Sequence, residues 1–255
     1  MATVLSGTSG ALYYKPAGTS ATFTETNVNF TTDVITVAPY LGFKVGDPVQ
    51  FSVINVNTGA AGTGTLPAGL SAATTYYVIG YTAATGALTV SATLGGASVA
   101  ITDDGTAVTP NVFKVAYADS VAVGQVREWS FSVTREEIDV TTIGTESGQY
   151  VPFRTYISGF ADGEGSAMVY TTDDDTTIAS RMVQDVLQRQ QTGAEMKLYI
   201  DRVVSSGTVN DTLSRFIDVE VILLSASFSV NPDDGQMVEV SFRPSSAPTF
   251  DLSKT

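Results

Sequence analysis

Residues 127–140 read REWSFSVTREEIDV, and their pattern decides the fold. Up to Val133 apolar side chains occupy every second position, and mostly polar side chains stand between them. A period of two is typical of a β-strand with one buried and one solvated face. After Glu136 the apolar positions change parity, to Ile138 and Val140. The change indicates a β-bulge, or a strand that leaves its own core and enters a second apolar environment.

Further strands follow towards the C-terminus. Residues 222–230 and 238–242 alternate between apolar and polar side chains on either side of the turn Asn231–Gly235, which predicts a hairpin. Residues 196–200 and 166–171 predict two more strands. A strongly alternating set of this kind predicts a β-sandwich or barrel core.

One α-helix is predicted between these strands. The acids Asp173–Asp175 suit a helix start, and Gly193 suits its C-terminal stop. An apolar stripe at helical spacing lies between them, made of Ile178, Ala179, Met182, Val183, Val186 and Leu187. We expect the helix to cover one face of a sheet. The three acids could also hold a hard cation, although the spacing of an EF-hand loop is absent.

Residues 27–109 differ in composition from the rest of the chain. Charged residues are rare there, and five short apolar runs alternate with turn sequences rich in glycine, proline and aspartate. The runs are residues 34–37, 49–54, 76–79, 88–90 and 99–101. We predict a small all-β domain over 27–109, inserted into a discontinuous core domain made of residues 1–26 and 110–255.

Composition limits the function classes. The chain has no cysteine and no histidine, so disulfides, thiolate metal sites and histidine acid–base chemistry are excluded. No phosphate-binding loop, dinucleotide fingerprint or serine elbow occurs. We therefore expect no enzyme, no cofactor and no metal, although a carboxylate-only glycosidase remains an alternative. Asp162 and Glu164 form such a carboxylate pair, but a flexible connection into the next strand is the simpler interpretation.

The charge balance is strongly acidic. The chain has 13 basic and 26 acidic residues, which gives a net charge of −13. A protein that grips DNA needs clustered lysine and arginine, so binding by phosphate neutralisation is excluded. The acidity either aids solubility or suits a path along which DNA slides without adhering. No signal peptide or membrane span is evident, so we expect assembly in a cytoplasm.

The polar positions of the strand at 127–140 are the candidate functional residues. They are Glu128, Ser130, Ser132, Thr134 and Glu136. Two interpretations remain open at this point, an ordinary solvated sheet face and the wall of a pore without basic residues.

Two phrases in the second half of the chain carry a family resemblance. Residues 126–144, VREWSFSVTREEIDVTTIG, and residues 154–166, RTYISGFADGEGS, resemble the tail tube proteins of long-tailed bacteriophages, also called major tail proteins. The order of strand, helix and C-terminal hairpin after them is similar too. The resemblance covers residues 112–250, joins the opening Gly10–Lys15, and leaves 27–109 as an inserted β module.

The resemblance implies a structural virion protein. It implies a β-sandwich core with one flanking helix, and six subunits per ring whose long hairpins form one barrel around a lumen. Rings would stack into a tube for DNA ejection, with DNA passing without specific binding. The polar set from Glu128 to Glu136 would face the lumen, and Tyr150, Val151 and Phe153 would contact the next ring. Sheath, tape-measure, tail-terminator and baseplate proteins would be partners, in a virion assembled in the host cytoplasm. The alternative is a glycan-binding or adhesin-like baseplate or fibre protein.

Overall fold

The computed structural model describes residues 9–18, 20–124, 126–140, 154–170, 178–187, 191–205, 207–229 and 235–253. Over these residues the chain is mainly β, with one α-helix, so the predicted fold class is confirmed. The strands form two large sheets, each with its own hydrophobic core, and a small two-stranded ribbon.

The first sheet and the helix make up what we call the body. Its strand order is β10 (Val126–Asp139), β11 (Tyr156–Tyr170), β16 (Met237–Pro244), β15 (Arg215–Ser229), β12 (Glu195–Asp201), β1 (Ala11–Lys15) and β9 (Val121–Ala122), with β17 (Thr249–Asp251) beside β15. β15 pairs with β12 in its first part and with β16 in its second. This long strand therefore joins the two halves of the sheet around one core, and the predicted hairpin of β15 and β16 is confirmed.

Helix α1 (Ile178–Asp185) packs on the body core. Met182 is fully buried, and the other predicted apolar positions up to Val186 pack against the same core. Leu187 is the exception, because 90% of it is exposed beyond the end of the helix. Asp173–Asp175 lie outside the described residues.

The second sheet forms what we call the insert unit. Its strand order is β2 (Ala21–Phe23), β8 (Asn111–Tyr117), β5 (Pro48–Asn55), β6 (Tyr76–Thr82), β7 (Ala87–Ser91), β4 (Val34–Thr36) and β3 (Val28–Asn29). β2 and β8 lie outside the expected range 27–109, so the sheet extends beyond both expected boundaries. Composition did not predict β2 and β8 as part of this unit, because the change in composition lies inside the first and last strands of the sheet.

One predicted strand of the insert unit is wrong. Residues 99–101 form no strand, although Val99 N–H donates to Val90 O at 2.9 Å. Ile101 instead fills the core of the unit, and its N–H donates to the Asp33 side chain at 2.8 Å. A buried apolar run next to turns carries the same pattern as a short strand.

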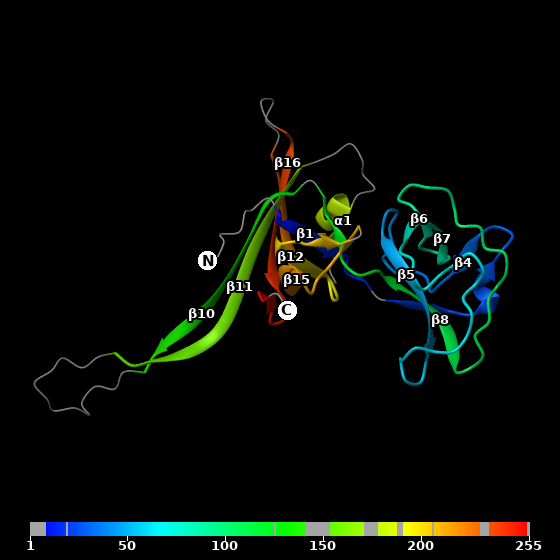
Figure 1. The fold of residues 1–255 in the computed structure, drawn as a ribbon, viewed down its shortest axis with the longest axis horizontal. Coiled ribbons are helices and arrows are strands. Elements are labelled where there is room, and N and C mark those ends of the chain that lie inside the picture. Colours follow the sequence, from blue (N-terminus) through cyan, green and yellow to red (C-terminus); the bar gives the residue numbers. More distant parts are fainter. Residues whose placement is uncertain are drawn as a thin grey trace, which may run out of the picture.

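The arrangement in space separates three parts (Figure 1). The β10–β11 hairpin projects from the body at one end of the long axis, and the insert unit lies at the other end. The small ribbon of β13 (Val204–Ser205) and β14 (Thr208–Val209) lies in the chain between β12 and β15 of the body.

Candidate assembly surface

The β10–β11 hairpin extends well beyond the sheet that carries it. The two strands pair from Val126–Val169 to Asp139–Tyr156, but β11 pairs with β16 only over Gly165–Tyr170. Within the described residues, β10 has β11 as its single neighbour, and the segment of β11 from Tyr156 to Glu164 has β10 as its single neighbour. Both margins of the projecting part are therefore open strand edges, which are templates for pairing with another chain.

The pairing shifts register twice. Arg135 pairs with Ala161 and Glu137 with Ser158, so two β11 residues, Gly159 and Phe160, oppose Glu136 alone. This bulge lies where the sequence predicted an irregularity, although the extra residue belongs to β11. Bulges bend a strand and increase its twist. Phe160, at the bulge, is 86% exposed.

The buried face of the hairpin root packs around two glycines. The rings of Phe131 and Phe242 stack at a centroid distance of 6.2 Å, on either side of Gly165. A Cβ at Gly165 would lie 2.4 Å from the Phe242 ring, and one at Gly163 would lie 2.8 Å from Pro244. Gly163 and Gly165, in the segment DGEGS at residues 162–166, are therefore required by the close packing of β16 against β11.

The opposite face of the same four strands is polar. One row across the sheet consists entirely of serine, in the order Ser130, Ser166, Ser241 and Ser225. Its hydroxyls meet in pairs, at 3.1 Å between Ser130 and Ser166 and at 2.6 Å between Ser225 and Ser241. Neighbouring rows place Glu128, Met168, Glu239 and Ser227 together, Ser132 opposite Glu164, and Thr134 opposite Asp162. The face therefore consists mainly of small hydroxyls and carboxylates, and it also carries Arg243 beside Asp162.

The five lumen candidates lie on β10, and all are exposed in the isolated chain. The sheet brings partners to them that we did not predict, chiefly Ser166, Ser225, Ser241 and Glu239. The alternation of the β15–β16 hairpin in the sequence indicated a polar face, but only the pairing register shows that this face continues the polar face of β10. Tyr150, Val151 and Phe153 lie outside the described residues.

Two expectations for this region are wrong. Asp162 and Glu164 belong to the continuous strand β11 and not to a flexible connection. Asp162 faces Arg243 at 3.7 Å, in an exposed ion pair. Val133, expected on the buried face, is 46% exposed, because Gly163 opposite it offers no side chain to cover it.

Apolar side chains are exposed along the projecting part. Ile138, Tyr156 and Ile157 are each between 41% and 52% exposed, in addition to Val133 and Phe160. A depression of about 300 Å³ lies at the root, lined by residues that include Val133, Gly163, Pro244 and Pro248. Exposed apolar groups on an open β-edge are features of an interaction surface.

Comparisons with known proteins give a partial structural likeness. No protein-family model and no curated protein matches the chain. One similar solved chain comes from a structure described as the virion of a native gene transfer agent particle, with 15% identity and a TM-score of 0.37. A second comes from the tail of an empty particle of that agent, with C6 symmetry, 14% identity and a TM-score of 0.37. The matches cover 51% and 52% of this chain and 88% and 87% of the other chains.

The part of the chain that the structure describes contains no helix with the length and hydropathy of a membrane span.

Proposed function

We propose that this chain is a subunit of a phage tail tube, which polymerises as stacked hexameric rings around a lumen through which DNA is ejected. The observation that carries the proposal is the β10–β11 hairpin. Its margins are open within the described residues, and a closed barrel of neighbouring hairpins would pair them. A ring forms when each subunit contacts the next through two different surfaces.

The polar face supports the assignment of the lumen side. Mainly hydroxyls and carboxylates lie on one side of the four strands, where Arg243 is paired with Asp162, and the core lies on the other side. A wall of this kind offers DNA few cations for phosphate contacts, and its carboxylates repel the polyanion through solvent. Glu128, Ser130, Ser132, Thr134 and Glu136 would be the contribution of β10 to this wall.

The position of the insert unit supports its place on the outside of the tube. It lies at the opposite end of the long axis from the projecting hairpin (Figure 1). If the hairpins surround the lumen, the insert units point away from it and leave the channel open. A density map of the tube without a protrusion on its outer wall would refute this placement.

Negative-stain microscopy of the purified chain tests the proposal. We expect rings or tubes from the wild-type chain, and loss of both in Val133→Lys, because a lysine at this apolar position opposes close packing of a neighbour. Val108→Lys is the matched control, since Val108 is 71% exposed on the insert unit and should not affect assembly. Compact monomers or trimers of the wild-type chain at high concentration would contradict the proposal, and trimers that bind glycans would favour a fibre or adhesin protein.

A further inference from the structure

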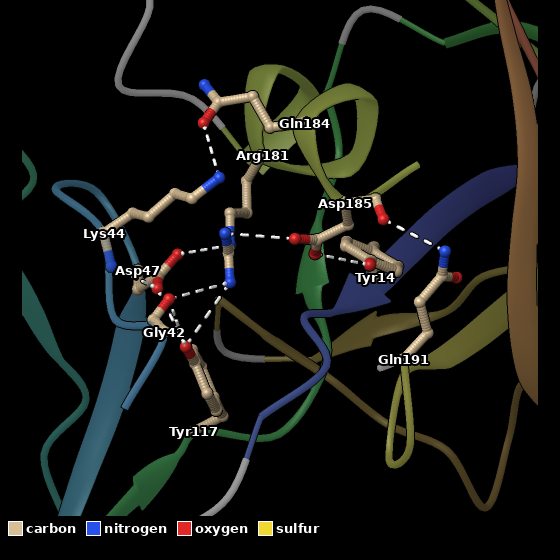
Figure 2. Close-up of polar contacts among 9 residues, drawn as sticks. All are labelled: Tyr14, Gly42, Lys44, Asp47, Tyr117, Arg181, Gln184, Asp185 and Gln191. Carbon is tan, nitrogen blue, oxygen red and sulfur yellow. Dashed lines mark hydrogen bonds and ion pairs between the residues drawn. The ribbon is translucent and has the colours of Figure 1, made fainter. Parts of the chain in front are cut away.

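A buried polar network joins the insert unit to helix α1 (Figure 2). Its centre is Arg181, which is 5% exposed, and its two carboxylates, Asp47 and Asp185, are fully buried. Asp47 immediately precedes β5 in the insert unit, whereas Arg181 and Asp185 lie on α1 in the body. One cation thus bridges an acid of the insert unit and an acid of helix α1 in the body.

All three nitrogen atoms of the Arg181 guanidinium contact polar groups. Nε of Arg181 lies 2.9 Å from Oδ1 of Asp47, and Nη1 lies 3.0 Å from Oδ1 of Asp185. Nη2 donates to the carbonyl of Gly42 and to the hydroxyl of Tyr117, both at 3.4 Å and both in the insert unit. The planar fork of arginine fits several acceptors at once, which the single ammonium of a lysine does not.

Each carboxylate also accepts a hydrogen bond from a tyrosine hydroxyl of its own unit. The hydroxyl of Tyr14, on β1, donates to Asp185 at 2.7 Å. The hydroxyl of Tyr117, on β8, donates to Asp47 at 3.1 Å, and the Lys44 N–H donates to the same carboxylate oxygen at 2.8 Å. Each carboxylate is thereby fixed to its own sheet and to the shared guanidinium.

The helix end is anchored to the body as well. The side-chain amide of Gln191 donates to the carbonyls of Asp185 and Leu223, each at 3.0 Å, and accepts from the N–H of Leu223 at 2.6 Å. The path from the insert unit to β15 therefore consists of hydrogen bonds and ion pairs without a gap. Separating the units would leave charged groups without their partners, unless water replaced every contact.

We propose that the Arg181 network is a lock that holds the insert unit in one fixed orientation on the body. Surface contacts between units of one chain ordinarily permit relative motion. Here the contact is a buried ion cluster whose two ion pairs lie at short distance but outside hydrogen-bond geometry. Direction comes from the hydrogen bonds of Tyr14, Tyr117 and Lys44 to the two carboxylates, so the two units move as one rigid body. The inference does not depend on tube formation, because every contact lies within one chain.

Spin-label distance measurements on the full chain test the lock. The chain contains no cysteine, so labels at Thr31→Cys and Glu220→Cys are unique, and both positions are exposed. We expect a narrow distance distribution in the otherwise wild-type chain. Arg181→Met, which keeps an unbranched side chain and removes the guanidinium and its charge, should broaden the distribution about twofold or more, as expected for freely moving domains.

The controls separate the lock from a general loss of structure. Arg243→Met removes an exposed arginine whose ion pair with Asp162 is 3.7 Å long, and it should leave the distribution narrow. Tyr117→Phe removes one hydroxyl of the network and should broaden the distribution to a smaller extent, which tests the lock if Arg181→Met fails to fold. A distribution that stays as narrow as wild type in every network variant that folds would overturn the proposal.

Discussion

The guanidinium of Arg181 and the carboxylate of Asp47 form a buried ion pair at 2.9 Å, and this pair connects the insert unit to helix α1 of the body. The removal of one member of such a pair leaves the other charged and buried, which costs about 3–5 kcal/mol. We therefore expect Arg181→Met to lower the free energy of unfolding by about that amount in denaturant titrations. Arg243→Met should change it by less than about 0.5 kcal/mol, as is usual for an exposed position. Equal effects of the two substitutions would contradict the structural role of the network.

The network should also make stability depend on pH. Burial raises the pKa of Asp47 to about 6, with the Arg181 charge acting in the opposite direction. Burial likewise raises the pKa of Asp185, against the Arg181 charge, the Tyr14 hydroxyl and the charge of Lys44. The folded chain then binds protons more tightly than the unfolded chain, so stability rises as pH falls towards and below 6.

The Asp47 contribution can be isolated. Between pH 8 and pH 5.5 this group should add roughly 1 kcal/mol to the free energy of unfolding, from the difference between its folded and unfolded pKa. Asp47→Asn removes the titrating group, so the gain on acidification should be smaller in this variant than in the wild-type chain. Parallel pH profiles of the two proteins would show that Asp47 does not titrate in this range.

Substitution of Gly165 by even the smallest side chain should destabilise the chain. A methyl group there would lie 2.4 Å from the Phe242 ring, so we expect Gly165→Ala to cost about 1–3 kcal/mol through overpacking. In a Phe242→Leu background the clash with the ring is relieved, although the 2.8 Å approach to the Ser130 carbonyl oxygen remains, so the same substitution should cost less. A double-mutant cycle in thermal or denaturant unfolding measures the difference, and a coupling of zero would refute the proposed cause.

Phe160 tests whether the projecting hairpin makes contacts between subunits. It is 86% exposed in one chain, and we expect Phe160→Asp to abolish tube formation in negative-stain images while the chain remains folded by circular dichroism. Tyr40→Asp replaces an aromatic residue that is 78% exposed on the insert unit and should assemble normally. Tubes formed by Phe160→Asp at wild-type yield would exclude this residue from the interface.

The polar face gives a prediction for DNA passage. If this face lines the proposed lumen, Ser132→Lys and Thr134→Lys should allow assembly but impair infectivity, because the introduced cations would bind DNA phosphates. Thr31→Lys adds the same charge at an exposed turn of the insert unit and should have no effect. Unchanged infectivity in both strand variants would place this face away from the lumen.

The period-two pattern of residues 127–140 predicted a long strand and its irregularity near Glu136, because alternation and parity are local properties of sequence. The polar character of the face was predicted for the same reason. The serine row was not, because its members come from four strands, and only the register aligns Ser130 with Ser225.

The lock could not be predicted from sequence at all. Asp47 stands in a Gly-Asp-Pro turn, where aspartate is common for local reasons, and Arg181 stands in a helix, where arginine is usually exposed. Their pairing depends on how two sheets meet, and no periodicity encodes that. Likewise, the limits of the insert unit follow from the pairing of β2 with β8, which brings together residues far apart in the chain.

Hydrogen exchange at the β10–β11 hairpin tests the central claim most directly. Peptides that cover residues 126–139 and 156–164 should exchange rapidly at their open edges in the unassembled chain. After assembly they should become strongly protected, because strand edges that have no partner strand within the described residues then pair with neighbouring subunits, while peptides of β5 should change little. Equal exchange of the hairpin before and after assembly would show that its edges find no partner in other copies of the chain.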